Sequence, residues 1–199
     1  MFRGMMPVTR ALVIACVLAF VLQQLLGDTL TISFALWPLD ASLYAPPFEP
    51  WQLVSYAFLH GGITHIAFNM FALYMFGSEI ERLLGTRRYL VYYFVCVIGA
   101  ALAQLAVAHV GGGEPRPTVG ASGGIFGLLL AYGLAFPQRR LVLLFPPIPM
   151  PAWLFVTLYG LVELFLGVTG TQEGVAHFAH LGGMAAGFLL ILYWRKRRA

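Results

Sequence analysis

The sequence has few charged side chains. They make up 10% of its 199 residues, whereas an ordinary soluble domain has about 25%. Hydrophobic residues reach 60%, and the mean hydropathy is +0.81. A chain of this size has too little polar side chain to cover its folded surface in water. The composition therefore excludes an ordinary water-soluble globular domain.

Cysteine is also scarce, and repeats and long polar stretches are absent. Cys16 and Cys96 both lie inside apolar segments, so we expect them to pack as small apolar side chains and to form neither a disulfide framework nor a metal site. The pI is about 9.3, but the basic residues follow the ends of the apolar segments and form no continuous face. We therefore expect no nucleic-acid partner.

The apolar residues gather in six blocks, several of which approach the roughly 20 residues that cross a bilayer. This pattern predicts an all-α polytopic membrane protein that forms a single domain over residues 1–199. The predicted spans cover residues 11–26, 55–76, 89–110, 120–136, 152–168 and 175–194.

The basic residues predict the orientation of these spans. If the N-terminus is cytoplasmic, eleven of the twelve basic residues lie in inner segments and Arg116 alone lies outside, as the positive-inside rule favours. We therefore expect both termini in the cytoplasm, with the second, fourth and sixth spans running from outside to inside. The inner set comprises Arg3, Arg10, Arg82, Arg87, Arg88, Arg139, Arg140, Arg195, Lys196, Arg197 and Arg198.

The segment between the first two spans, residues 27–62, is long and rich in aromatic residues and proline. Aromatic residues at this density beside a membrane are typical of the headgroup region. A loop this long is more often functional than a passive connection.

Polar residues inside apolar helices cost free energy unless they have partners or face water, so they indicate functional sites. In this chain they fall on the three spans that are expected to run from outside to inside. The second span has a histidine and an asparagine four residues apart, the fourth begins with a serine among glycines, and the sixth has two histidines followed by glycines. These residues are His65, Asn69, Gly120, Ser122, His177, His180, Gly183 and Gly187.

The same polar residues share one layer of the membrane. Ser122 and His180 each precede the inner end of their span by fourteen residues, which is about 21 Å of helix. His65 precedes the end of its span by eleven residues, or about 17 Å. All three are therefore expected in the outer half of the bilayer.

This layer holds the groups that acyl transfer requires. A serine hydroxyl becomes nucleophilic when a histidine accepts its proton. The tetrahedral intermediate then needs hydrogen-bond donors, which histidine, asparagine and backbone N–H groups can supply. The start of the fourth span offers unpaired N–H groups, and its glycines allow close approach.

On three motifs the sequence resembles the rhomboid family of intramembrane serine proteases. Residues 120–123 are similar to its Gly-x-Ser-Gly motif, residues 65–69 to its His-x-x-x-Asn motif, and residues 179–187 to its final helix, in which a histidine precedes a Gly-x-x-x-Gly packing seam. The three motifs occur in this order on alternate spans, and the resemblance covers nearly the whole chain.

The resemblance implies a six-transmembrane-helix rhomboid-like bundle and a Ser122–His180 catalytic dyad without an acid. The sequence likewise has no aspartate in the predicted spans. By the same resemblance, His65, Asn69 and the backbone N–H of Ser122 stabilise the oxyanion, and neither cofactor nor metal is expected. The reaction would be endoproteolysis of single-span membrane proteins near their outer end, in the plasma (inner) membrane, with the active site open to the outer side.

The resemblance also suggests supporting roles for further residues. Phe126 matches an aromatic position that packs on the catalytic imidazole, and His60 matches a structural or water-retaining histidine. Gly120, Gly183 and Gly187 belong to the supporting set, the last two because they allow the fourth and sixth spans to pack closely. Trp51-Gln52 stands where many members have Trp-Arg, which affects the anchoring of the first loop and not the chemistry.

Two further residues lie near the expected site. His177 shares a helical face with His180, but the glycine seam follows in register only if His180 is the base, so we assign His177 a hydrogen-bonding or solvated role. Glu163 is interpreted as a protonated or hydrogen-bonded structural acid, with a third catalytic member as the alternative.

Other classes of function remain as alternatives. Glycine-interrupted helices with polar residues near the midplane also occur in transporters, and the histidines could bind a metal. No repeat accompanies them, and no His-Glu-x-x-His pattern supports a zinc protease. A catalytically silent rhomboid-like binding protein is the third reading, although this chain retains both the serine and the histidine.

Overall fold

The computed structural model describes residues 4–39, 45–111, 116–143, 147–170 and 175–197, and these residues are mostly helical. Arg3 and Arg198, which entered the orientation argument, lie outside the described residues. The helices are α1 (Pro7–Leu26), α2 (Asp28–Phe34), α3 (Gln52–Ser55), the 3₁₀ turn η1 (Tyr56–Phe58), α4 (Ile63–Ala72), the π-helical segment η2 (Leu73–Gly77), α5 (Ser78–Leu84), α6 (Thr86–Gly111), α7 (Ser122–Ala135), α8 (Ala152–Thr169) and α9 (His177–Lys196).

Four helices among the described residues are long and apolar enough to cross a membrane: α1, α6, α8 and α9, with 18 to 26 residues each. The 14-residue α7 is apolar but shorter. Segments α4, η2 and α5 follow one another without a break, so the chain is helical from 63 to 84. The structure thus contains a polytopic helical bundle.

The helix boundaries differ most from expectation in the second predicted span. The chain turns before Ile63, and helix continues to Leu84 instead of ending at Phe76. The sequence suggested an earlier end because Glu79, Glu81 and Arg82 follow Phe76. Hydrogen-bond and ion-pair partners, several of them distant in the chain, accommodate these residues, so the helix does not end where the hydrophobicity ends.

Glu81 shows how the structure satisfies a buried charge. Its side chain is fully buried, and its two carboxylate oxygens accept the N–H groups of Val8 (3.0 Å) and Thr9 (2.8 Å) at the start of α1. The Thr9 hydroxyl donates a further bond of 2.8 Å. A carboxylate at this position caps α1 and interacts favourably with the positive end of its dipole.

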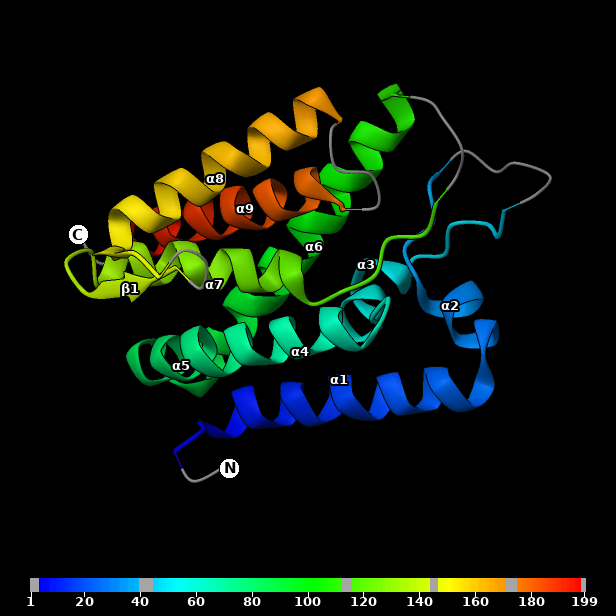
Figure 1. The fold of residues 1–199 in the computed structure, drawn as a ribbon, viewed down its shortest axis with the longest axis horizontal. Helices are drawn as coiled ribbons and strands as arrows, with labels where there is room; N and C mark the ends of the chain where they lie inside the picture. Colours follow the sequence, from blue (N-terminus) through cyan, green and yellow to red (C-terminus); the bar gives the residue numbers. More distant parts are fainter. Residues whose placement is uncertain (1–3, 40–44, 112–115, 144–146, 171–174, 198–199) are drawn as a thin grey trace.

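The bundle is built around α6 and α7. Figure 1 shows α1 along one side, α8 along the opposite side, and α4, α7 and α9 between them, with α6 crossing behind. Nearly every residue of α7 from Gly123 to Gly133 is buried. A helix that is apolar on all sides is typical of a bundle centre, which explains why α7 can be short.

Tyrosines of α6 and the first loop fill the space around α7, and they keep their hydroxyl groups paired. The Tyr92 hydroxyl donates to the carbonyl of Gly127 on α7 at 2.8 Å. Tyr56 donates to the carbonyl of Val97 on α6, also at 2.8 Å. Buried tyrosines with such partners stabilise the core without leaving a polar group unsatisfied.

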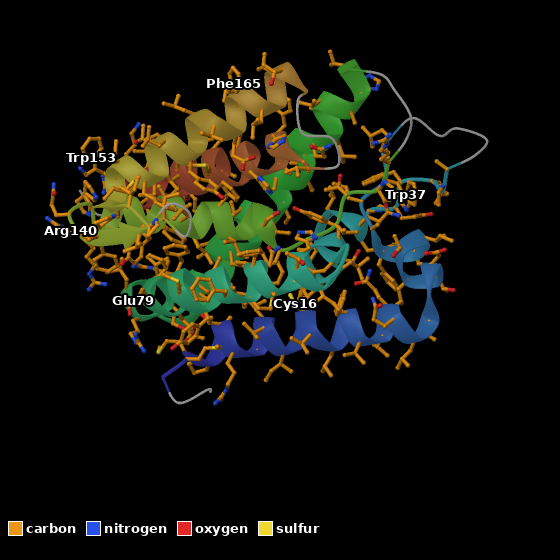
Figure 2. The ribbon with its side chains drawn as sticks, viewed as in Figure 1. Cys16, Trp37, Glu79, Arg140, Trp153 and Phe165 are labelled. Atoms are coloured by element: carbon orange, nitrogen blue, oxygen red, sulfur yellow. The ribbon has the colours of Figure 1, made fainter. Side chains whose placement is uncertain are left out.

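Helices α1 and α8 present apolar side chains to the outside. Phe165 is 63% exposed and Leu161 57% exposed, and Figure 2 shows Trp153 and Phe165 of α8 at the edge of the bundle. Large apolar side chains at this density on a free surface are suited to lipid. The buried side chains of α8, in contrast, form one narrow face made of Ala152, Val156 and Glu163.

Charged groups and a small sheet occupy the end of the bundle where α1 begins and α9 ends (Figures 1 and 2). Glu79 forms ion pairs there with Arg82 (2.7 Å) and Arg139 (2.8 Å). Strand β1 (Arg140–Val142) pairs antiparallel with β2 (Pro149–Pro151) between α7 and α8. The sequence analysis predicted no strand, and three-residue strands carry no periodic signal.

Candidate active site

Ser122 is the first residue of α7, and the segment before it is held by the first loop. Leu36 and Thr118 exchange backbone hydrogen bonds of 3.0 and 2.9 Å, and the N–H of Gly120 donates to the carbonyl of Tyr56 at 3.0 Å. Gly120 has a φ of +127°, a backbone conformation that residues other than glycine rarely adopt. The long loop therefore positions the serine.

Ser122 contacts His180 directly. The Ser122 Oγ lies 2.8 Å from His180 Nε2, although the two residues are 58 positions apart in the chain. Their helices approach closely because a Cβ on Gly183 would meet the backbone of Gly123. A distance of 2.8 Å allows the hydroxyl to donate its proton to the imidazole.

Glu163 of α8 contacts the other nitrogen of this imidazole. Its Oε2 lies 2.8 Å from His180 Nδ1 and 2.7 Å from His177 Nδ1, and all three residues are buried. An acid therefore contacts His180. The resemblance to the family had implied a site without an acid. The sequence offered one signal, because Glu163 lies eleven residues from the start of its span, about 16 Å deep.

An ionised Glu163 carboxylate would determine which nitrogen of His180 carries the proton. An ionised carboxylate only accepts hydrogen bonds, so His180 donates from Nδ1 and its neutral ring has a lone pair on Nε2. That lone pair faces the Ser122 hydroxyl. The arrangement gives the tautomer that a general base requires.

Phe126 fixes the plane of the His180 ring. The two rings are stacked, with centroids 4.2 Å apart and planes inclined by 5°. Phe126 also contacts Tyr159 of α8, with centroids 5.5 Å apart. Stacking on one face and hydrogen bonds at both nitrogens leave the imidazole little freedom to rotate.

His65 of α4 presents a hydrogen-bond donor near the serine. The N–H of Gly61 donates to His65 Nδ1 at 3.2 Å, so a neutral His65 carries its proton on Nε2. A Cβ on Gly120 would come within 2.8 Å of this Nε2 and within 3.7 Å of Ser122 Oγ. The His65 imidazole and the Ser122 hydroxyl therefore border the space that a side chain at position 120 would occupy.

Asn69 lies one helical turn further along α4 and is buried. Its amide nitrogen donates to the carbonyl of His65 at 2.9 Å. The amide group has two N–H donors, so one remains for another acceptor. Its Oδ1 is buried without a hydrogen-bond partner among the described residues.

His60 supports this arrangement from the loop. It is buried, its backbone N–H donates to Gln23 Oε1 at 2.9 Å, and its Nδ1–H donates to the carbonyl of Phe58 at 3.2 Å. Its ring meets that of His65 edge to face at 5.2 Å. Sequence analysis did not identify Gln23, because one glutamine in an apolar run has no spacing that marks it.

The two glycines of the final helix have different neighbours. Gly183 packs against the α7 backbone at Gly123, but Gly187 packs against Tyr92 and Cys96 of α6. Gly183 thus lies against the fourth predicted span, whereas the nearest neighbours of Gly187 belong to α6. Sequence periodicity places both on one side of α9 but does not show which helix lies opposite.

Gln52 anchors the first loop at the position where many rhomboids have arginine. It is buried, its Oε1 accepts the N–H of Trp37 at 3.1 Å, and its Nε2 donates to the carbonyl of Pro47 at 3.3 Å. The neighbouring Trp51 donates from its indole nitrogen to the carbonyl of Ser33 at 3.0 Å. The loop is thus tied at several points by neutral groups.

Among the described residues, Glu163, His177 and His180 also place their ligand atoms close enough to share a metal, within 4.8 Å of one another. Their short contacts, however, are nitrogen-to-oxygen hydrogen bonds that already use both Nδ1 atoms. A cation would have to displace these hydrogen bonds. The geometry fits a hydrogen-bonded cluster better than a metal site.

The sequence is similar to a known protein family. The family model for the Rhomboid domain matches residues 47–197. The chain is 31% identical to "Rhomboid protease GlpG" of Klebsiella pneumoniae, in an alignment that covers 96% of this chain and 66% of that protein. It is 29% identical to the protein of the same name from Yersinia enterocolitica, over 97% of this chain and 64% of that protein.

The chain belongs to the rhomboid family, and it is an integral membrane protein. It spans slightly less than two thirds of the length of these curated relatives. The family assignment accounts for the helical bundle and for the three motifs.

Proposed function

We propose that this protein is an intramembrane serine protease that cleaves membrane-spanning helices. The observation that carries the proposal is the 2.8 Å contact between Ser122 Oγ and His180 Nε2, at the start of a buried helix. The names of the relatives, which describe rhomboid proteases, are consistent with it.

The proposed reaction has two steps. The Ser122 oxygen attacks the scissile carbonyl, its proton moves to His180 Nε2, and the carbonyl oxygen becomes an oxyanion. The intermediate collapses, and His180 returns the proton to the leaving amine. A water molecule then hydrolyses the acyl-enzyme by the same proton transfers.

His65 Nε2–H, the free amide N–H of Asn69 and the backbone N–H of Ser122 are proposed to stabilise the oxyanion. All three are donors. The first two lie on one face of α4, and the third is unpaired because it begins a helix. Helix α7 also directs the positive end of its dipole toward this space.

We further propose that residues 1–199 form one domain with six spans. The continuous helix from 63 to 84 would rise about 33 Å, enough for a bilayer core. The short α7 would cross as a central helix shielded by its neighbours. The basic residues would place both termini in the cytoplasm and the site in the outer half of the membrane.

Proposed substrates are single-span proteins whose helix is weak near its outer end. A peptide bond inside a helix is already hydrogen-bonded and shielded, so it must unwind before Ser122 can reach it. Small residues beside the scissile bond are favoured because the site begins at glycines. Gly, Pro or polar residues near the outer end would promote unwinding.

The experiment that tests this function uses the purified protein in liposomes with a tagged single-span substrate. We expect Leu substitutions near the outer end of the substrate helix to slow cleavage strongly, while the same substitutions near the inner end change it little. Equal cleavage across the series, or sensitivity confined to the inner half, would contradict the proposal. Labelling of Ser122 by a fluorophosphonate separates a protease from a silent binding protein or a transporter.

The oxyanion assignment makes its own prediction. Loss of one oxyanion donor in a soluble serine protease costs about 10²–10³ in rate, but here several donors share the task. We therefore expect His65→Ala and Asn69→Ala each to lower kcat by about 10- to 100-fold, with both remaining measurable. Wild-type kcat in both variants would refute the role.

A further inference from the structure

We propose that Glu163 is a positioning residue for His180, so that the site works as a Ser122–His180–Glu163 triad and not as a dyad. This inference rests on the proposed function and deepens it. The carboxylate of α8 would select the reactive tautomer of His180 and stabilise the imidazolium that forms when Ser122 gives up its proton.

The hydrogen bonds form one continuous chain. Glu163 Oε2 contacts His180 Nδ1 at 2.8 Å, and His180 Nε2 contacts Ser122 Oγ at 2.8 Å. In soluble serine proteases the acid likewise accepts the Nδ1–H of the histidine and holds it in the correct tautomer. The same order of atoms is present here, with the acid supplied by a different helix.

Burial strengthens the interaction between a charged Glu163 and the imidazolium form of His180. Glu163 and His180 are 6% and 8% exposed, and charges interact more strongly away from water. When His180 accepts the serine proton, a cation forms beside an existing anion. This attraction stabilises the transition state more than the ground state, because the imidazolium forms only as the reaction proceeds. An interaction of this kind raises kcat.

His177 holds the carboxylate in place. It donates from Nδ1 to the same Oε2 at 2.7 Å, and its own Nε2 is buried without a hydrogen-bond partner among the described residues. An ionised carboxylate explains this pattern, because both histidines must then donate from Nδ1. His177 therefore positions Glu163, and Glu163 positions His180.

The placement of Glu163 on α8 supports the same conclusion. The other buried side chains of this helix are Ala152 and Val156, and most of its remaining surface is exposed and apolar. A carboxylate in such a helix is costly unless its partners compensate for burial. Its compensating partners here are the two histidines.

The test compares Glu163→Gln and Glu163→Leu with wild type in liposomes, with kcat and KM measured separately. Gln loses the charge and its amide can donate as well as accept, so kcat should fall by up to about 10⁴-fold, as when the acid of a soluble triad is replaced by its amide. Leu removes both the charge and the acceptor, so kcat should fall about 10⁴-fold or more, as when the acid is removed from soluble triads. KM should change little, because Glu163 acts through His180.

A nitrogen NMR spectrum of ¹⁵N-histidine-labelled protein provides a readout that needs no turnover. The chain has five histidines, so the signals can be assigned by substitution. In wild type His180 should carry its proton on Nδ1, and in Glu163→Leu this preference should be lost. A purely structural role would leave the tautomer unchanged in every variant that folds.

Glu81→Gln is the matched control, because Glu81 is also buried and hydrogen-bonded but caps α1. It should lower thermal stability and leave kcat per folded molecule within about twofold of wild type. The proposal is overturned if Glu163→Gln has wild-type kcat and the His180 signal is unchanged. Cleavage that survives Ser122→Ala would instead overturn the proposed function.

Discussion

Replacing Ser122 or His180 with alanine is expected to abolish hydrolysis. Loss of the nucleophile or the base in a soluble serine protease lowers kcat by about 10⁶-fold, so the activity of either variant should fall below detection. Both variants should still fold, because Ser122→Ala removes a single hydroxyl and in His180→Ala the carboxylate of Glu163 keeps His177 as a partner. The measurement is cleavage of the single-span substrate, with folding checked by extraction and thermal unfolding.

His177→Ala is the control for this prediction. It removes a neighbouring histidine from the same helical face but leaves the 2.8 Å contacts of His180 with Ser122 and Glu163. We expect substantial activity, reduced by about 10-fold or less because one hydrogen bond to Glu163 is lost. An inactive His177→Ala together with an active His180→Ala would show that the base has been assigned to the wrong histidine.

Gly183→Ala is expected to impair both stability and catalysis. The added Cβ would overlap the backbone of Gly123, which cannot move away as a flexible side chain can. Helices α7 and α9 would have to separate, at a cost of about 1–3 kcal/mol in the free energy of unfolding. Ser122 and His180 lie on these two helices, and a displacement of about 1 Å can lower kcat by about 10²-fold.

Gly160→Ala provides the matched control on α8. A Cβ at position 160 would meet the end of the Met184 side chain at 3.5 Å, an ordinary contact. Alanine favours a helix interior over glycine by about 1 kcal/mol, so this variant should be as stable as wild type or more stable, with unchanged kcat. Equal behaviour of the two variants in thermal unfolding and cleavage would refute the close-packing argument.

Composition and helix geometry suffice to predict a helical membrane protein and the depth at which its polar side chains lie. Hydrophobic length defines a helix that can cross a bilayer, and a fixed rise of 1.5 Å per residue converts position into depth. These two rules suffice to predict one shared layer for Ser122, His65 and His180. The three motifs around them then indicated the rhomboid family.

Sequence hydrophobicity did not predict that helix continues to Leu84, because it cannot detect compensation between distant residues. Glu81 resembles the end of a membrane segment, yet Val8 and Thr9 of α1 satisfy its carboxylate. These residues are more than 70 positions away. A hydropathy average over neighbouring residues therefore predicts that such a charged residue lies in water, outside the helix that crosses the membrane.

Which polar groups meet depends on how the helices pack against one another. Helical periodicity gives the face of a residue on its own helix, but the rotation and neighbour of each helix depend on packing. Gly183 meets α7 and Gly187 meets α6, although they are four residues apart. In the same way, the packing of α8 against α9 turns Glu163 from an isolated acid in an apolar helix into the partner of His180.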